Sequence, residues 1–364
     1  MRNKIKNATY FLMTFLITLL KGVEYIILLG TRSNGKSYAA KEYCLTEYIK
    51  KGVRFVYVRR YQMDVTNYKM ESWMGDMPIS TLTKGQWTTI KCLKEQFFFA
   101  KWSEDGKKLI TSKEPIGYCM SVQGDEHYKS LTYPDVGNFV FEEFITRNYY
   151  LPDEPTRLMS LISTVARNKK IKVICIGNTI SRICPYFTEW SLTGIKKQKP
   201  GTLDTYSMPI PDSDEVVKIG VYNCDNQMGS GMFWGELSKS ISGTAWECEL
   251  QPHLPKQVEC YRVLYELVVK KDDNLFLLQL LSDYKQAQNV TWYVQPKTTP
   301  IQKGSRVITD DYAIDPKWTL GFRPLTSNEM KVFDLIKNGK ICYSDNLTGT
   351  EFKQVIQMID GGIL

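Results

Sequence analysis

The sequence has few residues of the kinds that hold structural metals or build disulfide frameworks. It contains two histidines, and its nine cysteines are scattered, odd in number and never spaced as Cys-x-x-Cys. A zinc site needs cysteines and histidines at short, regular spacing, and a disulfide framework needs an even set of cysteines. We therefore expect neither in this chain, and a reducing compartment suits it best.

The sequence also lacks an apolar run long enough to span a bilayer. The N-terminal stretch MRNKIKNATYFLMTFLITLLKG imitates a signal peptide, since basic residues precede an apolar run from Tyr10 to Leu20. That run is about half of the ~20 residues that a membrane helix needs, and Lys21-Gly22 is no small-residue cleavage site. We expect a buried helix beside the first strand and no membrane partner, with secretion or anchoring as the alternative.

Internal repeats and low-complexity segments are absent too, so a fibrous or disordered chain is excluded. Hydrophobic residues make up 43% and charged residues 24% of the 364 residues, as in ordinary globular proteins. This length exceeds the size at which single cores usually stop growing, which predicts two domains. The net charge of +8 favours polyanionic partners such as nucleic acid, without identifying one.

Predicted strands and helices alternate over the first part of the chain. Parallel strands covered on both faces read as unbroken apolar runs, and such runs occur at residues 24–30, 53–60, 136–144 and 172–178. Helical spacing of apolar residues follows at residues 36–50 and 155–168, and alternating, turn-rich residues 87–120 predict a small antiparallel insert. This order is typical of an α/β fold with a mainly parallel sheet.

Changes in composition set the predicted domain boundaries. We predict a first domain at residues 1–200, a linker region at residues 201–235 and a smaller α+β domain at residues 236–364. In the last of these, two apolar runs on either side of Asp272-Asp273-Asn274 predict a hairpin, NVTWYVQP predicts a further strand, and residues 328–339 predict a late helix.

Two glycines mark the junction between the first predicted strand and the first long helix. GTRSNGKS matches the phosphate-binding loop GxxxxGK[ST], in which backbone N–H groups wrap phosphates at a helix N-terminus. Lys36 is expected to neutralise the β- and γ-phosphates of ATP, and the Ser37 hydroxyl to bind Mg²⁺. The predicted nucleotide-binding residues of the loop are Gly30, Thr31, Arg32, Ser33, Asn34, Gly35, Lys36 and Ser37.

Two adjacent acids end the third apolar strand, FVFEEF. Beside a phosphate loop, Glu142 would contact Mg²⁺ through water and Glu143 would act as general base toward the attacking water. Two acids after an apolar run also occur at a solvated strand end. Asn178 ends the next strand and is either a γ-phosphate contact or the start of a turn. Arg59 and Arg60 end the second strand, where a surface role and a nucleotide or DNA role are equally open.

Five segments together resemble a known family: GTRSNGKSYA, FVYVRRY, YPDVGNFVFEEF, TVARN and ICIGNTISRICPYF. In order and spacing they are similar to the genome-packaging ATPases of phi-29-like podophages, a branch of the terminase large-subunit motors. The resemblance covers residues 24 to about 190. It implies a P-loop NTPase domain of the additional-strand (ASCE) class, joined by a linker to an RNase H-like C-terminal domain.

The resemblance also implies activity, partners and further site residues. Family members form a ring, usually pentameric, on the capsid portal in the host cytoplasm and drive double-stranded DNA into a preformed prohead, with ATP and Mg²⁺ as cofactors. Arg167 falls where the family has an arginine finger that acts on the neighbouring subunit, and Lys129 where it has a second basic residue facing the adjacent site. From residue type alone, Arg167 would be a surface cation favoured at a helix C-terminus.

The sequence departs from the family pattern at two places. Glu142 stands where the family more often has Asp. The acids of the C-terminal part, Asp272, Asp273, Asp310 and Asp311, lie at turns and not within strands that could hold two metals. We therefore expect a C-terminal domain that grips DNA or portal without cutting DNA.

Two other functions compete with a packaging motor: a P-loop ATPase of another nucleic-acid or secretion motor class, and a nucleotide-switched DNA-binding module. The paired acids and the candidate finger favour hydrolysis over a switch, and the terminase-like order of the segments disfavours secretion. The sequence leaves open whether a structural RNA joins the motor, and how many subunits form the ring.

Overall fold

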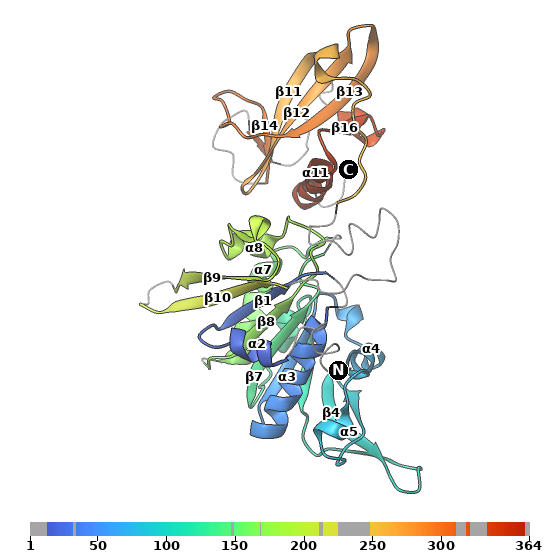
Figure 1. Ribbon diagram of the computed structural model, residues 1–364, viewed down its shortest axis with the longest axis vertical. Coiled ribbons are helices and arrows are strands. Elements are labelled where there is room, and N and C mark those ends of the chain that lie inside the picture. The colour runs from blue at the N-terminus through green and yellow to red at the C-terminus, as the bar shows by residue number, and fades with distance from the viewer. Residues whose placement is uncertain are drawn as a thin grey trace, which may run out of the picture. The chain divides into compact units, whose positions relative to one another are not determined.

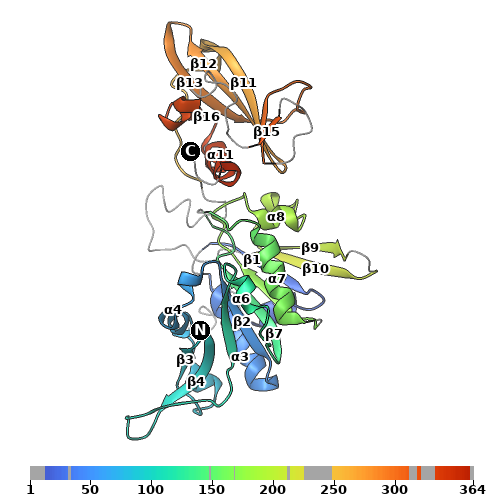
Figure 2. The ribbon, with the colours of Figure 1, turned by 180° about the vertical axis from the view of Figure 1, so that it is seen from behind.

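The computed structural model describes residues 13–31, 34–146, 149–167, 169–210, 214–224, 248–310, 318–320 and 333–360. These residues form two compact units (Figures 1 and 2). The first unit takes its described residues from within 13–146, 151–179 and 184–224. The second takes them from within 149–150, 180–183 and 248–360.

The first unit is built on one mixed sheet. Its strands are β1 (Tyr25–Leu29), β2 (Arg54–Arg59), β3 (Thr89–Leu93), β4 (Gln96–Trp102), β5 (Leu109–Thr111), β6 (Gly117–Ser121), β7 (Val136–Glu142), β8 (Lys172–Ile176), β9 (Thr202–Pro209) and β10 (Val216–Asn223). They lie in the order β3-β4-β6-β2-β7-β8-β1-β10-β9, with β5 paired to β4. The stretch from β6 to β10 in that order is parallel throughout.

The central strands are apolar because both faces of the sheet are covered. In β1, the side chains from Ile26 to Leu29 are fully buried, as expected of a parallel strand with helices on either side. Strand β8 lies between β1 and β7, which is the additional strand of the predicted class. The predicted α/β fold with a mainly parallel sheet is confirmed.

Helices cover the two faces of this sheet. Helix α3 (Lys36–Lys51) connects β1 to β2, and α7 (Glu154–Ala166) connects β7 to β8, in the opposite direction along the sheet. Right-handed crossovers in opposite directions place the two helices on opposite faces, as Figures 1 and 2 show. Helix α2 (Met13–Leu19) adds Leu16 and Leu19 to the core cluster that includes Ile26. Of the helices described, none is long and apolar enough to cross a membrane.

The antiparallel insert is smaller than predicted. Strands β3, β4 and β5 form it, but β6 pairs in parallel with β2 and belongs to the central sheet. Helices α4 (Asn67–Met74) and α5 (Ile79–Leu82) pack beside the insert. Trp73 of α4 stacks on Tyr57 with ring centroids 3.7 Å apart, so the insert is joined to the central sheet by aromatic packing.

The structure corrects the predicted linker at residues 201–235. Residues 202–209 and 216–223 are β9 and β10, and residues 219–223 of β10 pair in parallel with the whole of β1. The polar residues and turn formers of this stretch, Pro, Gly, Lys and Asp, lie at the ends of a hairpin and on its exposed faces. Ile219 and Val221 of the same hairpin are buried. Residues 225–235 lie outside the described residues, as do the first residues of the C-terminal domain predicted at 236–364.

The second unit contains a mixed sheet covered by a helix. Its order is β15-β14-β11-β12-β13-β16. The elements are β11 (Tyr261–Lys271), β12 (Asn274–Asp283), β13 (Gln286–Pro296), β14 (Val307–Thr309), β15 (Trp318–Leu320), β16 (Ile341–Tyr343) and α11 (Asn346–Asp360). The predicted hairpin is confirmed, since Asp272 takes a positive φ of 52° between β11 and β12.

Helix α11 has no counterpart in the sequence prediction. The late helix predicted at residues 328–339 is helical at 333–337 among the residues described there. Phe352 of α11 packs edge-on against Phe276 of β12, and both belong to a core centred on the fully buried Trp292. The described segment 180–183 also belongs to this unit: Ile183 joins the same core, and the Ser181 hydroxyl donates to Gln354 Oε1 at 2.7 Å.

Strand β10 should be essential to the first unit. A fragment ending at residue 200 would expose the β1 edge and lose Ile219 and Val221, at about 1.5–3 kcal/mol for each buried side chain. We expect this fragment to aggregate or to melt roughly 10 °C or more below a fragment ending at residue 224. Thermal melting followed by circular dichroism compares the two. Equal melting temperatures would show that β10 is dispensable.

Candidate nucleotide-binding site

The loop between β1 and α3 has the backbone of an anion-binding turn. Gly30 and Gly35 have positive φ angles of 145° and 86°, and a Cβ atom on Gly30 would lie 2.7 Å from Asn34 Nδ2. Gly35 is the N-cap of α3, and no side chain caps the helix there. The first N–H groups of α3 therefore remain available to an anion. Arg32 and Ser33 lie outside the described residues.

Lys36 is buried inside this loop. Its ammonium donates to Thr31 O at 2.8 Å and to Asn34 Oδ1 at 2.9 Å. Burial lowers the pKa of Lys36 to about 8, although the nearby Cys224 and Glu142 raise it in part. Asn34 Nδ2 is buried and has no hydrogen-bond partner among the residues that the structure describes. A buried cation and an unused donor in one loop both fit a phosphate group, which would supply negative charge and acceptors.

Glu142 ends β7 level with the start of the loop. The strand register aligns Glu142 with Ile176 of β8, and Ile176 with Leu28 of β1. Two strand spacings, about 9.5 Å, therefore separate the axes of β7 and β1. Bound phosphates and a hydrated metal ion fit within such a gap.

The surroundings of Glu142 fit a metal ion. Its side chain is buried, Oε2 accepts a hydrogen bond from the Tyr57 hydroxyl at 3.1 Å, and Oε1 is buried without a partner in the described part of the chain. A buried carboxylate oxygen without a partner is costly unless a cation or water reaches it. Mg²⁺ takes oxygen ligands and uses one or two protein groups beside the phosphates, so Glu142 and the Ser37 hydroxyl are a suitable donor set.

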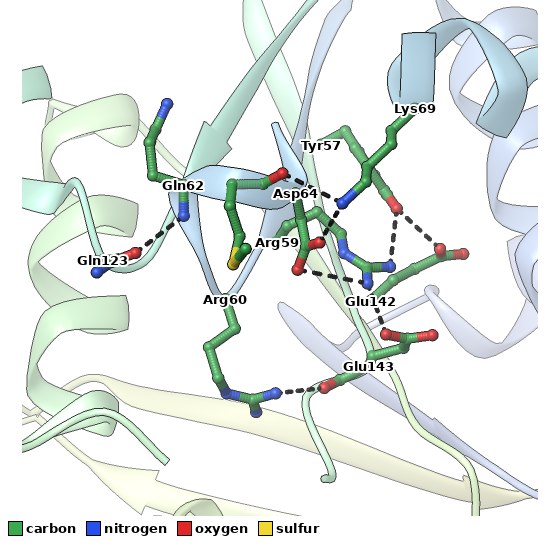
Figure 3. Close-up of polar contacts among 10 residues, drawn as sticks. Tyr57, Arg59, Arg60, Gln62, Asp64, Lys69, Gln123, Glu142 and Glu143 are labelled. Carbon is green, nitrogen blue, oxygen red and sulfur yellow. Dashed lines mark hydrogen bonds and ion pairs between the residues drawn. The ribbon is translucent and has the colours of Figure 1, made fainter. Parts of the chain in front are cut away.

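Glu143 is held apart from Glu142 by its backbone and by an arginine (Figure 3). Its φ is 56°, a left-handed conformation that costs a residue with a Cβ atom about 1–2 kcal/mol. Its carboxylate accepts from Arg59 Nη2 at 2.6 Å, and the Arg59 guanidinium also lies 4.0 Å from Asp64. Although burial lowers the pKa of Arg59, the Tyr57 hydroxyl and the Glu143 carboxylate raise it above its usual range.

Asn178 lies beside the loop. The N–H of Gly177 donates to Leu28 O at 3.0 Å, and that of Thr179 donates to Gly30 O at 3.1 Å. The chain on both sides of Asn178 is thus hydrogen-bonded to β1 and to the first loop residue. The structure therefore brings Asn178 to the same edge of the sheet as Lys36 and Glu142.

Arg167 and Lys129 lie elsewhere and close to one another. Arg167 caps the C-terminus of α7 with a φ of 40°, and its guanidinium donates to Leu131 O at 2.6 Å. Lys129, two residues before Leu131, pairs with Glu126 at 2.5 Å. Helix α7 has 13 residues, a length of about 20 Å, and returns from the carboxyl end of β7 to the start of β8, so Arg167 lies at the edge of the sheet opposite to the loop of its own chain.

Two residues of β2 and the residue after it contact the acids of β7, which sequence patterns did not reveal. Tyr57 and Arg59 contact the two acids of β7, and Arg60 donates to Glu143 O at 3.0 Å. The alternation of side chains along FVYVRRY was the available signal, because it places Tyr57 and Arg59 on one face and Arg60 on the other. The identity of the strand beside β2 could not be read from that pattern.

Comparison with known proteins identifies relatives over the first unit. The family described as podovirus DNA encapsidation protein (Gp16) matches residues 16–221. The DNA packaging protein of Bacillus phage phi29 is 29% identical over 58% of this chain and 59% of its own length. That of Bacillus phage B103 is 27% identical over 58% of this chain and 61% of its own length. The chain thus matches about three fifths of each relative.

Two solved structures share the fold along nearly the whole chain. The bacteriophage Phi-29 viral genome packaging motor assembly superimposes with a TM-score of 0.52 and 20% identity, covering 95% of this chain and 99% of that one. The Phi-28 gp11 DNA packaging motor superimposes with a TM-score of 0.51 and 16% identity, covering 96% and 98%. The fold of both units is therefore that of phage packaging proteins.

The pKa of Lys36 predicts how nucleotide binding depends on pH. In the free protein Lys36 loses its proton near pH 8, whereas phosphate oxygens would hold it charged up to or beyond the ordinary pKa of 10.5. Binding of ATP at pH 9 should take up close to one proton, and affinity should fall about tenfold for each pH unit above 8.

Calorimetry in buffers of different ionisation enthalpy measures the proton uptake. Lys36→Ala should abolish it, while Lys50→Ala, at an exposed position of the same helix, should not. Affinity that is independent of pH between 8 and 10 would contradict a buried Lys36 facing phosphate.

Proposed function

Because the chain belongs to the podovirus DNA encapsidation protein (Gp16) family, we propose that it is the ATP-driven motor that moves double-stranded viral DNA into a preformed prohead. One observation carries the proposal: a glycine-rich loop around a buried lysine lies at the same sheet edge as two acids in different environments. That arrangement is what phosphoryl transfer to water requires.

The roles of the loop and acids follow from their environments. The loop N–H groups, Lys36 and Asn34 would bind the phosphates of ATP, and Ser37 and Glu142 would hold Mg²⁺. Bound Mg²⁺ would neutralise charge that develops on the transferring phosphoryl group. Glu143 is the general base, since its carboxylate is more than half exposed at 62% and can therefore reach a water molecule. Asn178 would sense the γ-phosphate from the adjacent strand.

The pair with Arg59 holds the Glu143 side chain in one orientation. One carboxylate oxygen accepts from the guanidinium at 2.6 Å, so the carboxylate turns freely toward a water molecule once this contact breaks. The Arg59 guanidinium also contacts Asp64 and the Tyr57 hydroxyl, and these contacts can hold it in place when Glu143 turns away. A conformational change that displaces Arg59 would therefore affect ATP hydrolysis. Such coupling of conformation to hydrolysis is suited to a motor.

Ring assembly is supported by the position of Arg167. The helix is about 20 Å long and places Arg167 at the edge of the sheet opposite to the loop of its own chain, where it contacts Leu131, two residues after Lys129. We propose that both residues complete the ATP site of an adjacent subunit in a homo-oligomeric ring, which the family resemblance makes a pentamer. The ring would sit on the portal of the prohead in the host cytoplasm. A structural RNA is a further candidate partner.

The second unit is proposed to grip DNA or portal without cutting DNA. Lys271 at the end of β11 pairs with Asp310 and lies 3.8 Å from Asp272, so a cation separates two of the candidate carboxylates. Two-metal cleavage needs carboxylates that face one another across the metals. Asp311 lies outside the described residues.

The decisive experiment measures ATP hydrolysis with and without DNA and proheads. We expect stimulation that requires both, and Glu143→Gln should lower the stimulated rate by roughly 10² to 10⁴ while nucleotide still binds, because the amide keeps the shape but cannot accept a proton. Glu104→Gln, at an exposed hairpin turn, is the matched control. Stimulation by DNA alone would favour another nucleic-acid motor, and binding without turnover would favour a nucleotide switch.

Mixed rings test the action of Arg167 on a neighbour. Arg167→Ala and Lys36→Ala subunits should each form inactive rings. When they are mixed in equal amounts, about one quarter of the interfaces join an intact loop to an intact finger, so activity should recover to about that fraction. A finger contributes about 10³ to 10⁵ in rate, which makes the recovery measurable.

Lys169→Ala, at an exposed cation two residues away, should stay active in pure rings. A finger acting within its own subunit predicts no recovery in the mixture, and that result would exclude the proposed neighbour contact.

A further inference from the structure

Beside the candidate base lies a buried ion pair with no assigned role. Arg60 follows β2 and Glu154 begins α7, and the two side chains are 6% and 0% exposed. Arg60 Nε donates to both Glu154 oxygens, at 3.0 and 2.8 Å. Glu154 also accepts from the Leu151 N–H at 2.8 Å and from the Tyr186 hydroxyl at 2.8 Å. A carboxylate with this many donors holds the guanidinium in one orientation.

The remaining donors of Arg60 point at the backbone that carries the base. Nη1 donates to Glu143 O at 3.0 Å, and Nη2 donates to Phe144 O at 2.7 Å. The planar guanidinium thus spans two consecutive carbonyls on one side and a carboxylate on the other. A lysine ammonium is a point charge and cannot span the same three groups.

The backbone held in this way is strained. Glu143 has a φ of 56°, and a left-handed residue with a Cβ atom persists only where its surroundings determine it. From this geometry we infer that Arg60 is a positioning residue for hydrolysis: its clamp on the carbonyls of Glu143 and Phe144 fixes the conformation that aims the Glu143 carboxylate. The inference rests on the proposed function, because it takes Glu143 as the base.

Arg60 and the neighbouring Arg59 hold different parts of Glu143 (Figure 3). Arg59 binds the carboxylate, and Arg60 binds the main-chain carbonyl. Releasing Arg59 would free the side chain to rotate, while the backbone beneath it stays in place. The accuracy with which the carboxylate reaches a water molecule then depends on Arg60, and an error of 1 Å in such a group lowers rates by about 10².

Aromatic packing supports the clamp from the other side. Tyr186 packs edge-on against Phe141 and Phe144, with ring centroids 6.0 and 5.9 Å away, while its hydroxyl donates to Glu154. Replacing Tyr186 by Phe would keep this packing and remove one hydrogen bond to Glu154. That substitution weakens the clamp without leaving Arg60 as an unpaired buried charge.

The test compares Arg60→Lys in two backgrounds of the full chain, assembled with DNA and proheads. In the parent background we expect kcat to fall about 10- to 100-fold with the KM for ATP little changed, and the melting temperature to fall because buried carbonyls lose their donors. In the Glu143→Gln background, single-turnover hydrolysis of labelled ATP should be no slower with Arg60→Lys than without it. Residues that act through one another give such non-additive effects.

The outcomes distinguish a failure of the Glu143 assignment from a failure of the positioning role of Arg60. If Glu143→Gln leaves the rate unchanged, the assignment of the base fails. If Glu143→Gln is slow and Arg60→Lys lowers both backgrounds by the same factor, or lowers neither, positioning by Arg60 is overturned. If Arg60→Lys does not fold, Tyr186→Phe decides: a several-fold loss in kcat that is absent in the Glu143→Gln background supports positioning, and a rate equal to the parent overturns it.

Discussion

The site depends on one constraint: β2, β7, β8 and β1 are neighbours in the sheet and run parallel. Parallel strands end at the same edge of a sheet, so four segments far apart in the sequence deliver their following residues to one place. Lys36 and Ser37 follow β1, Asn178 follows β8, Glu142 ends β7 and Arg59 ends β2. The intervening β8 separates the loop from the acids by two strand spacings, and phosphate with its metal fits within that gap. A strand slipped by one residue would turn Glu142 to the other face.

Charges at this edge are left incompletely paired when no nucleotide is bound. The buried Lys36 has two neutral oxygen acceptors, and the buried Glu142 has one oxygen bonded to Tyr57 and one without a partner. Burial of both charges would be costly without compensation, and it lowers the pKa of Lys36. On the proposed function, a triphosphate and a divalent cation would supply charges of both signs. Their binding would offset the cost of burying Lys36 and Glu142.

Sequence patterns sufficed to propose those residues of the candidate site that lie within one short motif, and missed contacts that depend on strand pairing. The loop GTRSNGKS and the strand end FVFEEF carry their chemistry within a few residues, so the positions of Lys36, Glu142 and Glu143 could be proposed without knowing the sheet. The contacts of Arg59 and Arg60 arise because β2 happens to lie beside β7, and the partner Glu154 is far along the chain. Residues 202–223 were misjudged for the same kind of reason: their polar residues suggest a linker, whereas pairing with β1 makes β10 a buried strand.

Helix α7 connects two groups that, on the proposed function, affect ATP hydrolysis in different subunits. Its first residue is Glu154, which orients Arg60 beneath the candidate base, and Arg167 caps its other end. Leu158, Leu161 and Val165 are buried along its length, so the helix is packed as a rigid element and not as a tether. A displacement of Arg167 by a neighbouring subunit would therefore be carried to Glu154 and to the backbone of Glu143 with little loss. The contacts of Arg60 with the carbonyls of Glu143 and Phe144 would tolerate only small displacements. The rigid packing of α7 would therefore make the position of the Glu143 carboxylate sensitive to nucleotide binding in the adjacent subunit.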